Sequence, residues 1–421
     1  MERESEQINI YCSDGYKIRL SRSFLIQNCP GFNWKQFMDP TLGQSCIRVN
    51  VTSGIMNQVI EYLTDGEYEF RSVKDATDIY EISEKIGIVN LVDRCRDFLI
   101  EEMKVGNVCF IHDFACKHED LFVQFHCWKL FTSSTDEVLE SEDFLNCEES
   151  TVSRFLSRPI YRNTNEVSLF LNIYNWTTRR ISRSNLQEAS TSIENRELYR
   201  RTMQPFFHLI RFATMSRFNL ENEVFNKNLL SDEEVEGLRI FDDSVATAPL
   251  PSTICQNTRD RRYQSQSSLF TYKNRRNLEF TEEKPLPRFN TFFCQVWVEE
   301  DCFVTCLSLP IYFKSMPREN VILTRFLPST FFHEKTNLSI YGSGRVILPK
   351  PLFLKAKSDT LFKVLIQNVN PPSYSDEMVV RKEAHCYVTD DDFETMTKDL
   401  EDFLVYANGW RKFYFDIDLF F

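Results

Sequence analysis

Alternating apolar and polar residues open the chain and predict a β-hairpin. Residues 8–10 alternate, the turn-forming triplet Ser13-Asp14-Gly15 follows, and residues 18–20 alternate again. A later alternation over residues 47–51 predicts a third strand, and the intervening pattern favours short helices near residues 23–27 and 34–38. A small sheet is therefore expected at the start of the chain.

Helical periodicity then takes over as far as residue 103. Apolar residues share one helical face over residues 55–63 and again over 76–86, and each run stops at a glycine, Gly66 or Gly87. Asn90 fits the N-cap of a third helix. Strands followed by helices predict an α/β fold for residues 8–103.

Residues 104–242 show helical patterns almost throughout. Asn107-Val108-Cys109 starts one helix, and residues 121–128 line a second with large apolar side chains. Thr164-Asn165-Glu166 supplies capping residues for a further helix, which carries Trp176. This segment is expected to be an all-α domain.

Residues 243–285 change in character, because prolines, small polar residues and basic residues replace the helical pattern. The composition predicts a flexible linker. We interpret its basic residues as solvated loop positions, with a localisation signal or a site for an acidic partner as the alternative. These residues are Arg259, Arg261, Arg262, Lys273, Arg275 and Arg276.

Strand patterns occupy residues 286–421, separated by Pro, Gly and Asn turns. The clearest strand is the last, over residues 413–419, where Phe and aliphatic side chains alternate with Tyr and Asp. Eight to ten short strands would form an antiparallel β-sandwich. The whole chain is therefore expected to be a multidomain α+β protein.

The most specific pattern lies in residues 201–237 and resembles the end of a BACK domain in the BTB-BACK-PHR family of substrate adaptors. Two elements carry the likeness, an L-x-L-I-R-F-x-x-M-S pattern and an I-L-[ST]-D-x-E pattern. The matching residues are Phe207, Leu209, Ile210, Arg211, Phe212, Met215 and Ser216 for the first and Leu229, Leu230, Ser231, Asp232 and Glu234 for the second. Residues 59–66 similarly resemble a BTB (POZ) element, and the C-terminal strands look like a PHR-type sandwich.

The resemblance implies an adaptor that works without covalent chemistry. Such proteins typically hold a cullin-3-type scaffold through the BTB domain and first BACK helices, while the C-terminal domain presents a protein substrate to the ubiquitin ligase. The residues matching the family's scaffold-facing hydrophobic-x-Glu element are Phe37, Met38 and Asp39. Asp39 is one methylene shorter than Glu and precedes Pro40, so a weaker polar contact is expected. Residues 105–114 form a second candidate surface.

Alternative interpretations stay open. Phe37 and Met38 could instead cover the core of the BTB domain, and the protein could be a non-degradative scaffold or a decoy that has lost its cullin. Few residues precede Ile8, so the exchanged N-terminal element of many BTB dimers is expected to be missing and homodimerisation weakened. The substrate is not readable from the sequence; loops at 341–344 and 371–376 are candidate contacts by exposure alone.

Composition and charge limit the kinds of partner and the compartments expected for the protein. The net charge of −12 disfavours broad contact with a nucleic-acid backbone, which requires clustered Lys and Arg. No apolar run is long enough for a membrane span or a signal peptide. Thirteen dispersed cysteines suggest reduced thiols in the cytoplasm, with the nucleus as the alternative.

No motif for catalysis or cofactor binding emerges, so neither an enzyme activity nor a cofactor is predicted. The nearest metal-like set is Cys109, His112, Cys116 and His118, three of which could share a helical face. Because the segment is otherwise apolar and cysteine is commonly buried, we interpret these residues as part of a core and predict no metal site.

Overall fold

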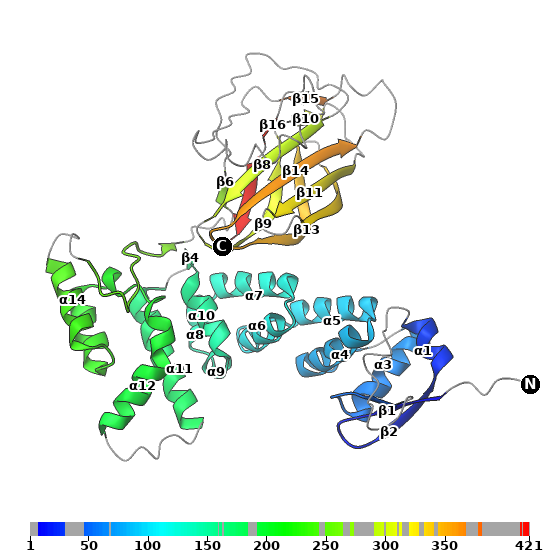
Figure 1. The fold of residues 1–421 in the computed structure, drawn as a ribbon, viewed down its shortest axis with the longest axis horizontal. Helices are drawn as coiled ribbons and strands as arrows, with labels where there is room; N and C mark the ends of the chain where they lie inside the picture. The colour runs from blue at the N-terminus through cyan, green and yellow to red at the C-terminus, as the bar shows by residue number, and fades with distance from the viewer. Residues whose placement is uncertain are drawn as a thin grey trace, which may run out of the picture. The chain divides into compact units, whose positions relative to one another are not determined.

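The computed structural model describes most of the chain, in two compact units, Met1–Val152 and Ser153–Phe421 (Figure 1). Both helices and strands are present, as the predicted α+β class requires. The described residues are 7–29, 46–66, 69–158, 160–161, 164–183, 192–243, 249–263, 270–272, 290–298, 300–309, 311–313, 320–327, 332–340, 344–367, 378–380, 413–414 and 416–420.

The predicted hairpin is confirmed at the start of the first unit. Strand β1 (Gln7–Tyr11) pairs antiparallel with β2 (Lys17–Ser21), and Gly15 in the turn adopts a φ of +81°, a left-handed conformation that glycine tolerates. Strand β3 (Cys46–Arg48) lies parallel to β1 on its other side, giving the order β2-β1-β3. The third strand is shorter than the expected residues 47–51, although the Val49 N–H still donates to the Tyr11 carbonyl.

The hairpin turn is tied to the helices behind the sheet. The Asp14 carboxylate accepts hydrogen bonds from the Ser53 N–H at 2.8 Å and the Ser53 hydroxyl at 2.7 Å, at the start of α3 (Ser53–Asp65). Helix α1 (Arg22–Asn28) follows β2 directly and is capped by Ser21. The helix expected at residues 34–38 lies outside the described residues.

Two further helices, α4 (Val73–Ile86) and α5 (Val89–Glu101), complete the predicted strand-to-helix order. Gly66 and Gly87 end α3 and α4 in left-handed conformations, as predicted. The prediction that Asn90 caps α5 is wrong, because the helix begins at Val89, two residues earlier than a cap at Asn90 requires. The Ile88 N–H donates back to the Ser83 carbonyl of α4, so the chain enters α5 at once, with Ile88 at the cap position.

Helices then continue as expected through the first unit. They are α6 (Val108–Lys117), α7 (Leu121–Ser133), α8 (Thr135–Leu139), α9 (Glu142–Leu145) and α10 (Glu149–Ser157), the last of which runs across the boundary between the units. Trp128 and Phe131 of α7 are almost completely buried, in agreement with the apolar pattern over residues 121–128. Large apolar side chains therefore stabilise this layer of helices.

The helical part of the second unit contains the segment with the most specific sequence pattern. Its elements are α11 (Glu166–Arg183), α12 (Ser192–Phe207), η2 (Phe212–Thr214), α13 (Arg217–Asn219), η3 (Leu220–Val224), η4 (Phe225–Lys227) and α14 (Asp232–Asp243). Asn165 accepts a hydrogen bond from the Ser168 N–H and so caps α11, as its position predicted.

The expected linker has to be corrected over residues 249–263, here called the strap, which pack against these helices. Ile254 and Cys255 are buried, and the Cys255 N–H donates to the Phe207 carbonyl at 2.9 Å. The strap ends in β5 (Arg262–Tyr263), which pairs in parallel with β4 (Ile160–Tyr161). At its start, Pro251 lies so close to α14 that a Cβ on Gly237 would come within 2.6 Å of the proline ring.

The strands of the second unit form two main sheets. One has the order β12-β11-β14-β8-β16 and the other β13-β9-β17-β6. Most pairs are antiparallel, but β16 runs parallel to β8. Their ranges are β6 (Phe270–Tyr272), β8 (Asn290–Trp297), β9 (Cys302–Ser308), β11 (Asn320–Leu327), β12 (Phe332–Ser339), β13 (Arg345–Leu354), β14 (Asp359–Gln367), β16 (Phe413–Tyr414) and β17 (Asp416–Phe420); β10 (Ile311–Phe313) and β15 (Met378–Val380) pair separately.

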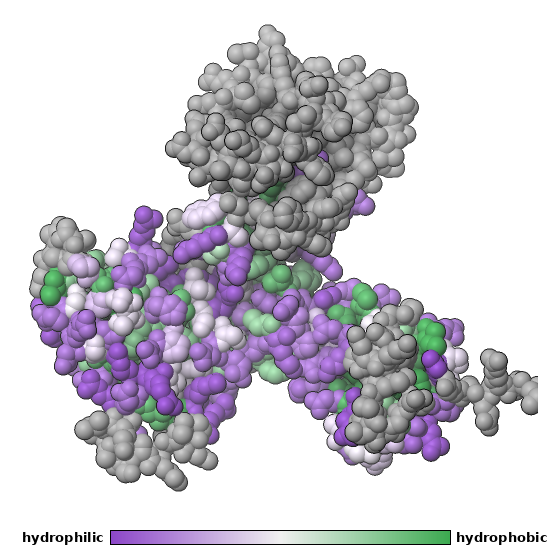
Figure 2. All heavy atoms as spheres, viewed as in Figure 1, coloured by the Kyte–Doolittle hydropathy of each residue, from purple (hydrophilic) through white to green (hydrophobic). Residues whose placement is uncertain are grey.

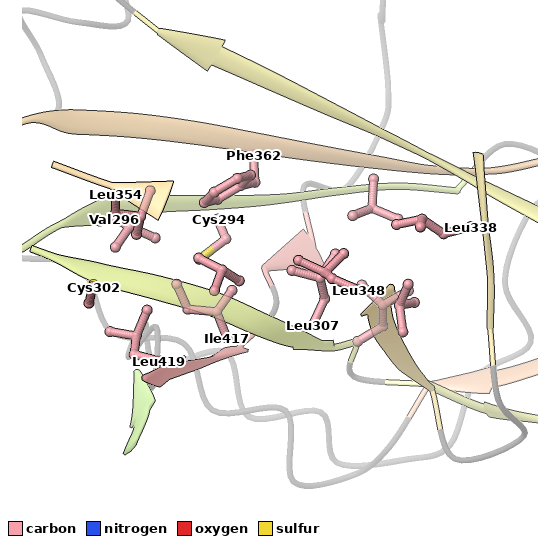
Figure 3. Packing of buried hydrophobic residues seen from close by; sticks show 14 of the residues in the cluster. Cys294, Val296, Cys302, Leu307, Leu338, Leu348, Leu354, Phe362, Ile417 and Leu419 are labelled. Atoms are coloured by element: carbon pink, nitrogen blue, oxygen red, sulfur yellow. The ribbon is translucent and has the colours of Figure 1, made fainter. Parts of the chain in front are cut away.

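Residues of both main sheets share one apolar core (Figure 3). Cys294 and Phe362 come from the five-stranded sheet, and Leu307 and Ile417 from the four-stranded one; all four are completely buried. The predicted last strand over residues 413–419 is not one strand but two, because β16 belongs to the first sheet and β17 to the second. The alternation of the sequence continues while the chain passes from one sheet to the other.

Candidate protein-interaction surfaces and the networks behind them

The three scaffold-facing residues predicted from the sequence, Phe37, Met38 and Asp39, lie outside the described residues. The described elements on either side of them are α1 and β3; Leu25 of α1, Cys29 directly after it and Ile47 of β3 are buried. Their role stays a prediction.

The second candidate surface, residues 105–114, is largely internal. Cys109, Ile111 and His112 of α6 are completely buried, whereas Phe110 is 39% exposed. The N–H groups of Cys109 and Phe110 donate to the Asp143 carboxylate, at 2.6 Å for Cys109, so the start of α6 is already occupied by an internal acceptor. Phe110 is thus the main apolar side chain that this surface offers to a partner.

A buried ionic group joins the helices that follow the small sheet to those of the predicted BACK segment. The Asp120 carboxylate accepts from the Tyr80 hydroxyl at 2.7 Å and from Arg96 Nε at 2.5 Å, and it caps α7 through the Val123 N–H. Burial, followed by the contact with Asp120, raises the pKa of Tyr80, so the phenol stays protonated and donates. The contacts bring α4, α5 and α7 together.

A second set of contacts joins α4 to α6. His118 Nδ1 lies 2.7 Å from Glu84 and its Nε2 lies 3.3 Å from Glu81, while Lys117 Nζ lies 2.6 Å from Glu81. Burial opposes ionisation of Glu81, but the hydrogen bonds from Lys117 and His118 outweigh it and lower the pKa of this carboxyl. Both sets of contacts fall within the first unit, so residues on either side of position 103 pack as one body.

A relay of polar side chains lies deeper in the first unit. His112 Nδ1 is 2.7 Å from the Thr151 hydroxyl, which donates to Asp113 at 2.5 Å, and the Glu148 N–H also donates to Asp113. Burial raises the pKa of Asp113 to about 6 despite these hydrogen bonds. The order of groups resembles a catalytic relay, but His112 and Thr151 have no exposed surface and cannot reach a substrate while the unit stays closed.

The metal-like set is divided among different contacts. His118 Nδ1 lies 2.7 Å from Glu84 and Cys109 lies beside Cys147, whereas Cys116 Sγ lies 3.7 Å from both ring nitrogens of His112, which also contacts Thr151. Within the described ranges, no three His, Cys, Asp or Glu side chains are grouped so that they could hold a metal ion. Burial raises the pKa of several cysteines there, to about 11 for Cys29 and about 12 for Cys95.

The resemblance-carrying segment turns out to be a structural framework. Phe207, Ile210, Phe212 and Met215 are buried, which accounts for the apolar positions of the first element. Ser216 caps α13 by accepting from the Asn219 N–H. The apolar residues of this element therefore pack in the core, and its serine caps the following helix.

The second element forms a capping box at the start of α14. The Glu234 N–H donates to the Ser231 hydroxyl, and the Ser231 N–H donates to Glu234 Oε2 at 2.7 Å. The same carboxylate receives two hydrogen bonds from Arg200, at 2.8 and 3.1 Å, and one from the Thr253 hydroxyl of the strap. These hydrogen bonds overcome burial and lower the pKa of Glu234 to about 2.

Arg261 corrects the interpretation of the basic residues in the predicted linker. Its side chain is only 6% exposed, and it meets Glu166 through Nε at 2.8 Å and Nη2 at 3.0 Å. It also donates to the carbonyls of Arg158 and Leu209. The capping triplet Thr164-Asn165-Glu166 drew attention to Glu166 in the sequence. No local pattern indicated that Arg261, 95 residues later, is its partner.

Arg211 of the I-R-F element extends this group. Its backbone N–H donates to Glu166 Oε1 at 2.7 Å, and its guanidinium donates to the Arg259 carbonyl of the strap. Burial, followed by the neighbouring Arg261, lowers the pKa of Arg211. Arg211 matches the I-R-F pattern of the sequence, but nothing in that pattern indicates that Arg211 holds the strap.

Large apolar side chains that remain exposed mark the other candidate surfaces. Figure 2 shows the helices in this view as mainly hydrophilic, with hydrophobic residues in small separate patches. Among the described residues, the exposed large apolar side chains are Tyr16, Ile26, Val89, Phe110 and Leu121 in the first unit and Phe218, Ile240, Trp297 and Ile347 in the second. Of the predicted contact loops, residues 341–343 and 371–376 lie outside the described residues, and Gly344 adopts a φ of +78°.

No protein-family model matches the chain, and no curated protein matches it. No helix in the described part of the chain has the length and apolar character needed to cross a lipid bilayer.

Proposed function

We propose that the protein is a substrate-recognition adaptor of the BTB-BACK-PHR type, acting with a cullin-3-type ubiquitin ligase. The observation that carries the proposal is the first unit. A hairpin, a third strand and helices α3 to α5 occur in the order expected of a BTB fold, and they pack with the next helices as one body. An adaptor of this type uses both parts to hold its scaffold.

The second unit supports the proposal through its two sheets. They share an apolar core, as a divergent PHR-like sandwich would, and such a domain would present the substrate. Arg154 of α10 lies 2.6 Å from Asp301, just before β9, so a salt bridge links a helix of this unit to its sheets.

The test is calorimetric binding of the full chain to the N-terminal region of cullin-3. Submicromolar binding by the wild type, with a loss of about 2 to 4 kcal/mol in the variant Phe37→Ala, is expected if Phe37 fills an apolar pocket. Asp39→Ala is expected to weaken binding less, because Asp39 is short and precedes Pro40. Phe218→Ala is the matched control, since Phe218 is an exposed phenylalanine in the other unit.

The competing proposal is a non-degradative scaffold or decoy without a cullin. The Asp39-Pro40 sequence favours it, because it departs from the Glu of the family element. Absence of wild-type binding at tens of micromolar would reject the ligase adaptor and retain this alternative. Binding that Phe37→Ala and Asp39→Ala both leave unchanged would show that the scaffold-facing residues are wrongly assigned.

A further inference from the structure

Strand β2 forms one edge of the small N-terminal sheet. In the order β2-β1-β3, β2 pairs with β1 and with no other strand of the described residues. An edge strand presents backbone N–H and C=O groups with which an extended segment of another chain can pair.

The face of the sheet that carries Tyr11 is basic. The strand register places Lys17 and Arg48 on opposite sides of Tyr11, and Arg19 opposite Asn9 in the next row. Lys17, Arg19 and Arg48 are all exposed, and Lys17 Nζ lies 5.5 Å from the centre of the Tyr11 ring. Three cations thus lie on one face of the small sheet in a chain whose net charge is −12.

The opposite face of β2 is apolar and only partly covered. Ile18 and Leu20 lie on the same face as the buried Ile10 and Ile8, their partners in β1, yet both remain half-buried at the edge. Ile26 of the following helix α1 is 51% exposed, and Figure 2 shows hydrophobic residues at the surface over that helix. A strand added beside β2 would therefore meet positive charge on one face and apolar side chains on the other.

We propose that the edge of β2 binds an extended acidic segment of a partner protein as a fourth strand. Side chains of a strand alternate between the two faces, so the segment would alternate acidic with apolar residues. Its carboxylates would lie opposite Lys17 and Arg19, and its apolar side chains would continue the row of Ile18 and Leu20.

The same three features disfavour two competing occupants. If β2 of a second copy paired with this edge in the antiparallel sense, the basic residues would face one another, and like charges directly opposite destabilise a pair of strands. A nucleic acid would use the phosphate-binding capacity of the basic face but not the backbone edge or the apolar row, and the acidic chain as a whole repels it. The acidic strand uses all three features.

This site does not depend on the proposed ligase function. It involves none of the residues Phe37, Met38 and Asp39, so a protein that failed to bind cullin would still be expected to bind the acidic segment. Loss of one interaction therefore leaves the other open to measurement.

The experiment measures fluorescence anisotropy of a short end-capped peptide of alternating Glu and Val with the full-length protein. Binding is expected with the wild type, and at least about tenfold weaker binding with Lys17→Glu/Arg19→Glu, since two attractive pairs become repulsive. The matched control is Lys85→Glu/Lys104→Glu, which changes the same charge at exposed positions of the same unit and should bind as the wild type. Both double variants alter exposed side chains, and circular dichroism verifies that they fold.

Two further peptides separate strand pairing from charge attraction. A peptide of the same composition, with its Glu and Val in separate blocks, and one N-methylated at every residue, so that neither edge can donate, should both bind at least about tenfold more weakly than the alternating peptide. Equal binding of either peptide would overturn the proposal, as would wild-type affinity in Lys17→Glu/Arg19→Glu or no binding of the alternating peptide at all. Tighter binding of a single-stranded oligonucleotide, lost in the same variant, would assign the face to nucleic acid instead.

Discussion

In the first unit Arg96 meets Asp120 with 24% of the arginine side chain still exposed, whereas in the second unit Arg261 meets Glu166 with 6% of either side chain exposed. Arg96 can keep part of its hydration. Arg261 has lost nearly all of its water and depends on the carboxylate and two carbonyls for replacement. An ion that is buried without a partner destabilises a protein far more than one that stays in contact with water. Removal of one charge is therefore expected to lower the free energy of unfolding more in the second unit than in the first.

The largest effect is expected from breaking the pair in the second unit. Glu166→Gln leaves the Arg261 charge buried without its counter-ion and should lower the free energy of unfolding by about 3 to 5 kcal/mol. Urea unfolding of the full chain would measure the loss, and hydrogen exchange should increase first in the strap. The double variant Glu166→Gln/Arg261→Met should lose less than the two single variants together, because no buried charge remains.

A surface pair provides the control for this prediction. Arg239 meets Glu221 at 3.1 Å through two nitrogens, but both side chains are well exposed. Glu221→Gln should change stability little. A loss as large as that of Glu166→Gln would mean that burial does not set the difference.

A smaller effect is expected from the corresponding change in the first unit. Asp120→Asn weakens the contact with Arg96 but leaves that arginine partly hydrated and still 2.7 Å from Asp93. The expected loss is about 1 to 3 kcal/mol, including the weaker hydrogen bond from Tyr80. Hydrogen exchange of α4, α5 and α7 would measure this loss of stability locally. A loss equal to that of Glu166→Gln would contradict the expected difference between the two units.

Local features of the fold could be predicted from the sequence, whereas the contacts between distant residues could not. The hairpin, the ends of α3 and α4 and the apolar face of α7 follow from turn residues and periodicity, which act over a few positions. Arg261 could not be placed, because its partner is separated from it by 95 residues and a loop arginine looks the same whether solvated or buried. Likewise the alternation over residues 413–419 contains no signal that β16 and β17 belong to different sheets.

Changes of pH are expected to affect stability with opposite signs in the two units. The pKa of Glu234, lowered to about 2 from an ordinary 4.5, means that its contribution to stability is complete at neutral pH and is lost as the pH falls from 4.5 towards 2. The pKa of Asp113 is raised to about 6 from 3.8, so folding favours its protonated form. Its contribution is therefore present below pH 3.8 and is lost as the pH rises through 6.

Denaturation profiles between neutral and acid pH would test this opposition. The advantage of the wild type over Glu234→Gln should shrink as the pH falls below 4.5. The stability of the wild type relative to Asp113→Asn should instead increase as the pH falls from neutral to 4. The buried carboxylate of Asp113 becomes protonated in that range, whereas the asparagine of the variant does not titrate. Two profiles that run parallel to the wild type would contradict both assignments.

The distance along the chain between Glu166 and Arg261 also has a consequence in time. A ribosome adds roughly 5 to 20 residues per second, so the 95 residues between the two take roughly 5 to 20 seconds to make. Throughout that interval α11 exists without the cation that neutralises its first carboxylate. The nascent second unit must therefore keep Glu166 in water, and its helices can close only after the strap has left the ribosome.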